Sequence, residues 1–370
     1  MKKLLLLMVV AAVGLMSCQN ANSTNSKKAT EAENTSTVAS PNPNPAPSIS
    51  LSGAGSTFAG PLYKTAFSKY LKETGISVSY GLTGSGAGIR SLKDRVVDFC
   101  GSDAFLSNAD MAKMPGDVVH IPTCSGAVDI AFNLPGIASL KLTPEVLTKI
   151  FMGKINNWNN AELKELNPGV KFPHLAISVV HRSDGSGTTS IFSDYMSKVS
   201  KAWKDQVGTG KSLNWPVGMG AKGNPGVAGT ISATKGAIGY IGSDYAFAQK
   251  ISFALLRNKA GNYIAPTIAA VSAAGKGEMP ADTRVMETNS SAADAYPISG
   301  FTWIIIYKNQ DYNGRSFAQA QANLKLIDWL LDPQVQAIAK ELKYAPLPEK
   351  VVKLAKGILR TVNYNGKPLL

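Results

Sequence analysis

The sequence has few of the side chains that most often bind metals or carry out nucleophilic chemistry. Only three Cys and three His occur among its 370 residues. The histidines, His120, His174 and His181, do not have metal-ligand spacing, and there is no Cys-x-x-Cys pair. A Gly-x-Ser-x-Gly nucleophile elbow is also missing. These absences predict a protein that is not an enzyme and that needs neither a metal nor another cofactor.

The N-terminal apolar stretch is too short to span a bilayer. It runs from Leu4 to Met16, whereas a membrane helix needs roughly 20 residues. Lys2 and Lys3 precede it, as in a secretion signal, so residues 1–17 are predicted to be a signal peptide. The Leu-x-Ser-Cys ending resembles the bacterial lipobox, which implies that Cys18 is acylated and becomes the mature N-terminus.

Residues 18–47 contain almost no large apolar side chains. They are mostly Asn, Ser, Thr, Ala and Pro, which cannot form a core, so a disordered tether is expected. Together with the acylated Cys18, this predicts an exported protein that contacts the membrane only through its lipid. Its location would be the periplasm or the outer face of the cell membrane.

The rest of the chain is longer than one core usually supports, so two domains are expected. The formal net charge is +13, with 38 basic and 25 acidic residues. The lysines are scattered rather than clustered with aromatics and Arg, which argues against a nucleic-acid partner. Cys100 and Cys124 both lie in apolar, strand-like surroundings, and the sequence leaves open whether they form a disulfide or remain free thiols.

Three Gly-, Ser- and Thr-rich turns each follow a strand pattern and precede a helix pattern. The first, residues 52–58, leads into a helix near Pro61, and the second, residues 83–88, into a helix at about 89–96. The third, residues 181–190, begins with His181 and Arg182. Unpaired N–H groups at helix N-termini and the guanidinium of an Arg suit an oxyanion, so the three turns together predict a small-anion site.

Asp103 follows another strand pattern, residues 97–102, and is an unusual residue for an anion site. A buried carboxylate would repel sulfate, but it would accept the proton that phosphate still carries near neutral pH. A site built around one such hydrogen bond can discriminate by roughly 10⁴ to 10⁵. The sequence from Gly218 to Gly223 matches the dinucleotide fingerprint by letters but follows no convincing strand, so a nucleotide site is not predicted there.

Alternating strand and helix patterns continue along the chain and predict α/β layers. Residues 118–132 read as strands broken by Pro122, and residues 136–166 read as helical with a start at Thr143-Pro144. Further predicted strands and helices lie at residues 236–242, 301–306, 318–331 and 333–342.

From about Ser50 to Leu370 the chain resembles the phosphate-binding protein of the bacterial ABC phosphate importer. The resemblance is carried by an ordered series of motifs, none of which is specific alone. They are Gly53-Ala54-Gly55-Ser56-Thr57-Phe58, Gly84-Ser85, Val97-Asp98-Phe99 with Ser102-Asp103, Arg182 with Asp184-Gly185-Ser186-Gly187-Thr188, Val207-Gly208-Thr209-Gly210, Gly236-Ala237-Ile238-Gly239-Tyr240 and Tyr344-Ala345-Pro346-Leu347-Pro348.

This resemblance implies a two-lobed α/β fold of the type II periplasmic-binding-protein class, with a ligand cleft between discontinuous domains. Lobe one would be residues 48–128 and 300–370, and lobe two residues 129–299. The protein would be a monomer that binds inorganic phosphate and delivers it to the membrane subunits of an ABC permease and, through them, to the ATPase.

The same resemblance implies a set of phosphate-binding residues. Asp103 would accept the phosphate proton and also pair with Arg182, while the other members would donate hydrogen bonds. The full set is Thr57, Phe58, Ser85, Asp103, Arg182, Ser186, Gly187 and Thr188.

Three other classes of protein could use an anion site of this kind. A hydrolase of phosphate esters is disfavoured because His181 and Asp184 lie too close in sequence to Ser183 and Ser186 to form a triad with them. A surface adhesin would suit the tether and the basic charge equally well. A sulfate or molybdate binder is disfavoured because Asp103 would repel an anion that carries no proton.

Overall fold

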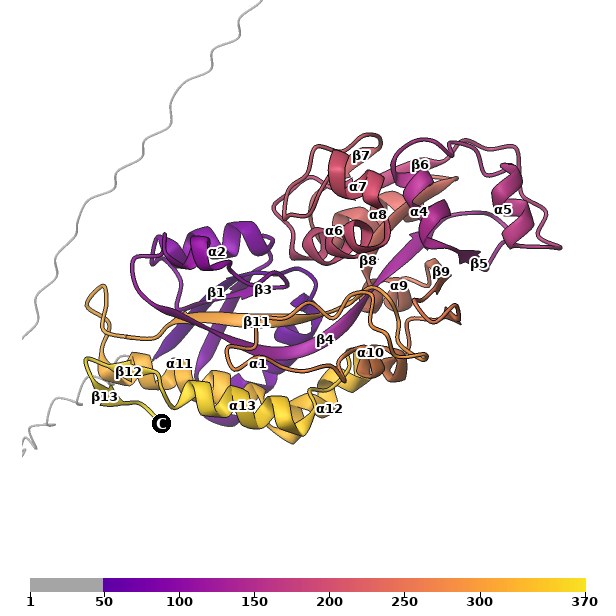
Figure 1. The fold of residues 1–370 in the computed structure, drawn as a ribbon. Coiled ribbons are helices and arrows are strands. Elements are labelled where there is room, and N and C mark those ends of the chain that lie inside the picture. The colour runs from indigo at the N-terminus through magenta and orange to yellow at the C-terminus, as the bar shows by residue number, and fades with distance from the viewer. Residues whose placement is uncertain (1–48) are drawn as a thin grey trace, which may run out of the picture. The chain divides into compact units, whose positions relative to one another are not determined.

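The computed structural model describes residues 49–370, in which strands and helices alternate (Figure 1). The predicted signal peptide, the acylation site Cys18 and the tether lie outside the described residues. Within the described part, no helix is both long enough and apolar enough to cross a membrane.

The first lobe combines N-terminal strands with C-terminal helices. Its strands are β1 (Ser50–Gly55), β2 (Ser77–Gly81), β3 (Phe99–Ser102), β4 (Val118–Phe132) and β11 (Ser299–Tyr307). They are ordered β2-β1-β3-β11-β4, and β1 is parallel to both of its neighbours while β11 is antiparallel to both of its own. The remaining elements are α1 (Gly60–Thr74), α2 (Ser85–Lys93), α3 (Asn108–Met111), α11 (Phe317–Leu330), α12 (Pro333–Glu341), α13 (Glu349–Leu359), β12 (Asn363–Tyr364) and β13 (Lys367–Pro368).

The second lobe is formed by the middle of the chain. Its strands are β5 (Ser139–Leu142), β6 (Ser178–Arg182), β7 (Met219–Ala221), β8 (Ala237–Gly242), β9 (Ser252–Arg257) and β10 (Tyr263–Ile264). The sheet continues from the first lobe in the order β4-β8-β6-β7, and β9 pairs with β4, β5 and β10. The helices are α4 (Pro144–Phe151), α5 (Ala161–Leu166), α6 (Gly187–Val199), α7 (Lys201–Gln206), α8 (Gly223–Ala233) and α9 (Ser243–Ala248), whereas α10 (Ile268–Ala274) packs against β4 and β11.

Strand β4 belongs to both lobes. Residues 118–127 pair with β11, and residues 128–132 pair with β8 (Figure 1). The expected break at Pro122 is wrong, because β4 is one strand of 15 residues. Pro122 pairs with Trp303 where the register to β11 shifts, and an irregular position of this kind tolerates the missing N–H of a proline.

The helical prediction for residues 136–166 is only partly correct. The segment contains β5, in which Leu140 and Leu142 are buried while Ser139 and Lys141 are exposed, as the alternation of a strand requires. The predicted helix start is confirmed, because Thr143 Oγ1 accepts a hydrogen bond from the Val146 N–H at 3.3 Å and Pro144 is the first helical residue. Helix α4 then ends at Phe151, well before the predicted end.

The connection that leads back from the second lobe packs against strands of the first. Thr283 Oγ1 donates to the His120 carbonyl at 2.8 Å, and Trp303 Nε1 donates to the Thr283 carbonyl at 3.0 Å. Arg284 also reaches the Leu106 carbonyl at 2.8 Å. These contacts place part of the segment predicted as lobe two beside β4 and β11, and the lobe boundaries stay a prediction.

The two cysteines are buried free thiols, which answers the question that the sequence left open. Cys100 lies on β3 opposite Ile305, and Cys124 lies on β4 opposite Thr302. Strand β11 therefore separates them, and two strand spacings amount to roughly 9–10 Å. A disulfide needs Cα atoms closer than about 7 Å, so the sheet itself keeps these thiols apart.

We expect both thiols to be unreactive in the native protein. Burial raises the pKa of each thiol and also blocks access of reagents to the sulfur. In a Cys18→Ser variant, a thiol reagent such as dithionitrobenzoate should label essentially no cysteine in buffer and two per chain in guanidinium. Labelling of either cysteine at native rates, or fewer than two thiols after denaturation without reductant, would contradict this arrangement.

Candidate anion-binding site

The predicted turns meet at one edge of the sheets, because each follows the carboxyl end of a strand. The turns after β1 and β2 and residue Asp103 after β3 come from three parallel strands of the first lobe. The turn after β6 comes from the second lobe and leads into α6. Ligand sites of α/β proteins lie at such strand ends. Helix α2 begins at Ser85, earlier than predicted, so Ser85 is its first residue.

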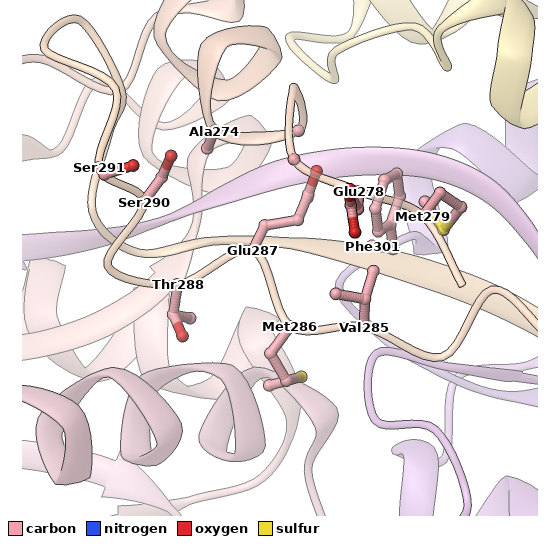
Figure 2. A pocket seen from close by; sticks show the side chains of 12 residues that line it. Ala274, Glu278, Met279, Val285, Met286, Glu287, Thr288, Ser290, Ser291 and Phe301 are labelled. Atoms are coloured by element: carbon pink, nitrogen blue, oxygen red, sulfur yellow. The ribbon is translucent and has the colours of Figure 1, made fainter.

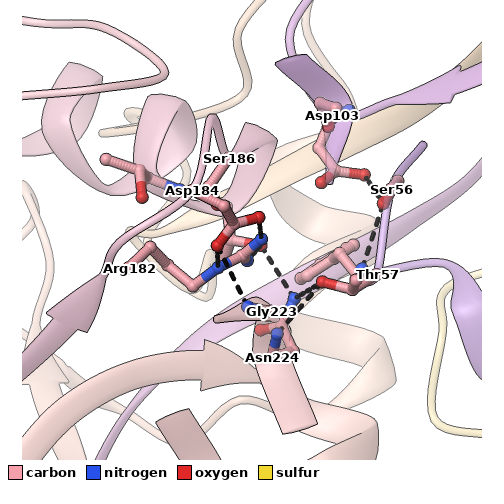
Figure 3. Close-up of polar contacts among 12 residues, drawn as sticks. Ser56, Thr57, Asp103, Arg182, Asp184, Ser186, Gly223 and Asn224 are labelled. Atoms are coloured by element: carbon pink, nitrogen blue, oxygen red, sulfur yellow. Dashed lines mark hydrogen bonds and ion pairs between the residues drawn. The ribbon is translucent and has the colours of Figure 1, made fainter. Parts of the chain in front are cut away.

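The eight predicted site residues are all buried. Their exposed fractions range from 0% for Ser85, Ser186 and Thr188 to 4% for Arg182. Gly187 shows how closely they approach, since a Cβ at this position would lie 2.5 Å from both Asp103 Oδ2 and Ser85 Oγ. The structure therefore brings residues of both lobes into one enclosed cluster (Figure 3).

Asp103 is anchored through one carboxylate oxygen. Ser56 Oγ donates to Oδ1 at 2.5 Å and Thr302 Oγ1 donates to the same atom at 2.7 Å. Within residues 49–370, no hydrogen bond reaches Oδ2. Burial raises the pKa of Asp103 to about 6, while the hydroxyls of Ser56, Thr302 and Ser85 and the charge of Arg182 oppose that rise. The carboxyl group is therefore mostly ionised at pH 7.

Arg182 pairs with Asp184, and the expected pair with Asp103 is wrong. Nε donates to Asp184 Oδ1 at 2.7 Å and Nη2 donates to Oδ2 at 2.6 Å, which is a bidentate arrangement. Burial opposes the ionised form of Asp184, but the hydrogen bonds and charge of Arg182 outweigh it and lower the pKa of that carboxyl. Arg182 Nη1 is left for Thr188 Oγ1 at 3.3 Å, and its charge still acts on Asp103.

Phe58 and Ser186 both already form a hydrogen bond within the protein, the first as donor and the second as acceptor. The Phe58 N–H donates to Ser56 Oγ at 3.0 Å, at the turn into α1. Ser186 is the N-cap of α6, where its Oγ accepts from the Thr189 N–H at 3.0 Å, so its own O–H proton is free to be donated.

Sequence reasoning missed Asn224, which lies at the start of α8 and is fully buried. Its side chain and backbone N–H contact Thr57 (Figure 3). Its side chain also contacts Thr188. The available signal was the sequence from Gly218 to Gly223. As predicted, no strand precedes this motif; the short strand β7 lies within it, and α8 begins at Gly223.

The two lobes contact each other directly around this cluster. The Gly86 N–H donates to the Gly185 carbonyl at 2.8 Å. Tyr245 of α9 donates from its hydroxyl to the Thr57 carbonyl at 2.7 Å. The lobes are therefore closed over the site.

Comparison with known proteins agrees with this geometry. A family model described as the PBP superfamily domain matches residues 26–334. A phosphate-binding protein PstS of Xylella fastidiosa (strain Temecula1 / ATCC 700964) is 36% identical over 353 residues, covering 94% of each chain. The PstS of Pasteurella multocida (strain Pm70) is 38% identical over 306 residues, covering 81% of this chain and 87% of the relative. The chain belongs to the PstS family of phosphate-binding proteins.

Solved structures show the same two-lobed fold. A high-affinity periplasmic phosphate-binding protein solved with phosphate superposes with a TM-score of 0.64 at 22% identity, covering 84% of this chain and 93% of that one. An ancestral soluble variant of the human phosphate binding protein gives a TM-score of 0.66 at 19% identity, with coverages of 84% and 93%. The family resemblance and the fold class expected from the sequence are confirmed.

We expect Asp103→Asn to stabilise the phosphate-free protein at neutral pH. The pKa of Asp103 is about 6 in the folded state and about 3.8 when exposed, so its contribution to stability falls as pH rises through this interval. An Asn at this position carries no charge, so stability is not lost as the pH rises. Its side-chain oxygen can still accept the hydrogen bonds from Ser56 and Thr302. Chemical denaturation at pH 7.5 should give an unfolding free energy larger by about 1–3 kcal/mol, and the gain should vanish near pH 4.

Asp98→Asn is the matched control, because Asp98 is a carboxylate paired with Arg315 in the same lobe. It should lower stability at pH 7.5. If Asp103→Asn lowers stability instead, the ionised carboxylate of Asp103 is not destabilising in the folded protein, and the prediction is wrong.

Proposed function

We propose that this protein binds inorganic phosphate between its two lobes and delivers it to an ABC-type phosphate permease. The observation that carries the proposal is Asp103 Oδ2. It belongs to a buried carboxyl group whose hydrogen bonds from Ser56 and Thr302 both go to the other oxygen, Oδ1, and it lies with Ser85 Oγ beside Gly187 in a site that also contains Arg182. A ligand that is an anion and yet brings a proton satisfies both Asp103 and Arg182. The names of the PstS relatives support this reading.

The remaining site residues would donate hydrogen bonds to the other phosphate oxygens. The donors would be hydroxyls and backbone N–H groups at the helix N-termini, together with the guanidinium of Arg182. The Phe58 N–H would be shared between phosphate and Ser56 Oγ, because Ser56 already accepts it. The proposed set is Thr57, Phe58, Ser85, Asp103, Arg182, Ser186, Gly187 and Thr188.

Asp103 would set the choice between phosphate and sulfate. Phosphate near neutral pH carries a proton that an ionised Asp103 can accept, whereas sulfate would place a bare oxygen against the carboxylate. Leaving one buried polar group without a hydrogen bond costs about 1–3 kcal/mol of binding free energy. Placing the sulfate oxygen next to the carboxylate costs more, because two negative charges then repel each other.

Delivery would depend on lobe closure. Since phosphate would contact both lobes only when they are closed, it would shift the population towards the closed form, which the permease would then recognise. The lobes would follow the sequence prediction, with residues 48–128 and 300–370 in one and residues 129–299 in the other. Within this proposal the protein is an exported monomer anchored through Cys18, and it has no enzymatic step and no cofactor.

Calorimetric titration tests the proposal. The protein is first stripped of ligand and then titrated with phosphate and with sulfate near pH 7. Phosphate should bind tightly and sulfate negligibly. Asp103→Asn should weaken phosphate binding by about ten- to a hundredfold and narrow the gap to sulfate, because it removes both the proton acceptor and the repulsive charge.

Asp98→Asn should leave both affinities unchanged. Absence of phosphate binding to the stripped protein would overturn the proposed function, and release of phosphate from ester substrates would favour the hydrolase alternative. An unchanged preference for phosphate in Asp103→Asn would overturn the role given to Asp103.

A further inference from the structure

Residues of the second lobe form several hydrogen bonds to Thr57 of the first lobe. Asn224 donates to Thr57 Oγ1 twice, from its backbone N–H and from its side-chain Nδ2, both at 3.0 Å. The Tyr245 hydroxyl donates to the Thr57 carbonyl at 2.7 Å. Three of the hydrogen bonds between the lobes therefore end on one residue of the turn after β1.

These contacts determine what the Thr57 hydroxyl can do. A hydroxyl oxygen has two lone pairs and one proton. Asn224 occupies both lone pairs of Thr57 Oγ1, so the hydroxyl can take part in a further hydrogen bond only by donating its proton. Thr188 Oγ1 is constrained in the same way, because it accepts from Asn224 Nδ2 at 3.0 Å and from Arg182 Nη1 at 3.3 Å.

The orientation of the Asn224 amide is set independently of Thr57. Its Oδ1 accepts the Gly242 N–H at 3.0 Å, so Nδ2 must be the end that faces the two threonines. Thr188 and Gly242 both belong to the second lobe, and Asn224 is fully buried. The second lobe can therefore hold this amide ready before the lobes close.

We propose that Asn224 is a positioning residue for the ligand and a latch between the lobes: it turns one hydroxyl from each lobe, Thr57 and Thr188, into an obligatory donor towards the bound anion. This inference rests on the proposed phosphate function. Asn224 itself acts through the two threonines rather than as a ligand of the anion.

The arrangement also determines where the proton of the ligand lies. Ligand oxygens that face Thr57 and Thr188 must accept hydrogen bonds from them, and neither hydroxyl can accept a proton donated by the ligand. The ligand proton is then directed to Asp103 Oδ2, the acceptor on the other side of the cluster. Selectivity against fully protonated or uncharged ligands thus comes from Asn224, and selectivity against sulfate from Asp103.

The test is a double-mutant cycle in phosphate titrations near pH 7. Asn224→Ala should weaken phosphate binding by about ten- to a hundredfold, since it leaves the threonine hydroxyls free to rotate and removes the latch. In a Thr57→Val background the same change should cost less than about fivefold, because its main target is gone and Thr188 keeps Arg182 as a partner. Thr57→Ser, which retains the hydroxyl, should bind within about threefold of wild type.

The latch has a kinetic signature of its own. Stopped-flow measurement of phosphate release should show that most of the loss in Asn224→Ala is a faster dissociation rate, because the closed form is less stable once the contact to Thr57 is missing. If Asn224 had only a structural role, Asn224→Ala would lower the melting temperature of the phosphate-free protein but would not make phosphate dissociate faster.

Asn323→Ala is the matched control. Asn323 is a fully buried Asn of α11 whose Nδ2 donates to the Asp98 carbonyl, away from the cluster. It should lower thermal stability and leave phosphate affinity unchanged. The latch is overturned if wild type and Asn224→Ala bind phosphate equally well. It is also overturned if the losses in binding free energy of Asn224→Ala and Thr57→Val are additive in the double variant. If wild type binds no phosphate, the proposed function itself fails.

Discussion

The site depends on keeping a carboxylate ionised inside a closed protein. A buried charge without a partner is costly, and Asp103 is buried with one oxygen left without a donor within residues 49–370. Its other oxygen is fixed by Ser56, from the turn after β1, and by Thr302, from the centre of β11. These two elements flank β3, so the sheet order itself places donors on both sides of Asp103.

The second lobe supplies the opposing charge without neutralising Asp103. Because Arg182 is engaged in a bidentate pair with Asp184, it is held rigidly and contributes its charge at a distance. A direct pair between Arg182 and Asp103 would satisfy both groups and close the site without a ligand. The Asp184 pair therefore keeps Arg182 from neutralising Asp103. Asp103 can then still accept a proton from a ligand, as a binding site for a protonated anion requires.

Local sequence pattern was sufficient to identify the turns that the fold brings together. The turns after β1, β2 and β6 combine glycines, hydroxyls and helix starts within a few residues, and the family motifs add the spacing between them. Partners that are chosen by the fold could not be predicted in this way. Asn224 reaches Thr57 only because the start of α8 in the second lobe faces the turn after β1, and β4 accommodates Pro122 only because the register to β11 shifts there.

The contrast between Asp103 and Glu287 shows how the number of donors decides the role of a buried acid. Glu287 packs beside β11, where it lines a pocket of about 220 Å³ with Met286 and Phe301 (Figure 2). Burial raises its pKa to about 8, and Ser125 is the only group that opposes this rise, with a hydrogen bond of 2.5 Å. Glu287 is therefore mostly neutral at pH 7.

Asp103 is equally buried, but two hydroxyl donors to its carboxylate and the charge of Arg182 keep its pKa near 6. At pH 7 Glu287 has thus already taken up its proton, whereas Asp103 is ready to accept one. Only the second can distinguish a ligand by its proton, and it lies where the strand ends of both lobes meet.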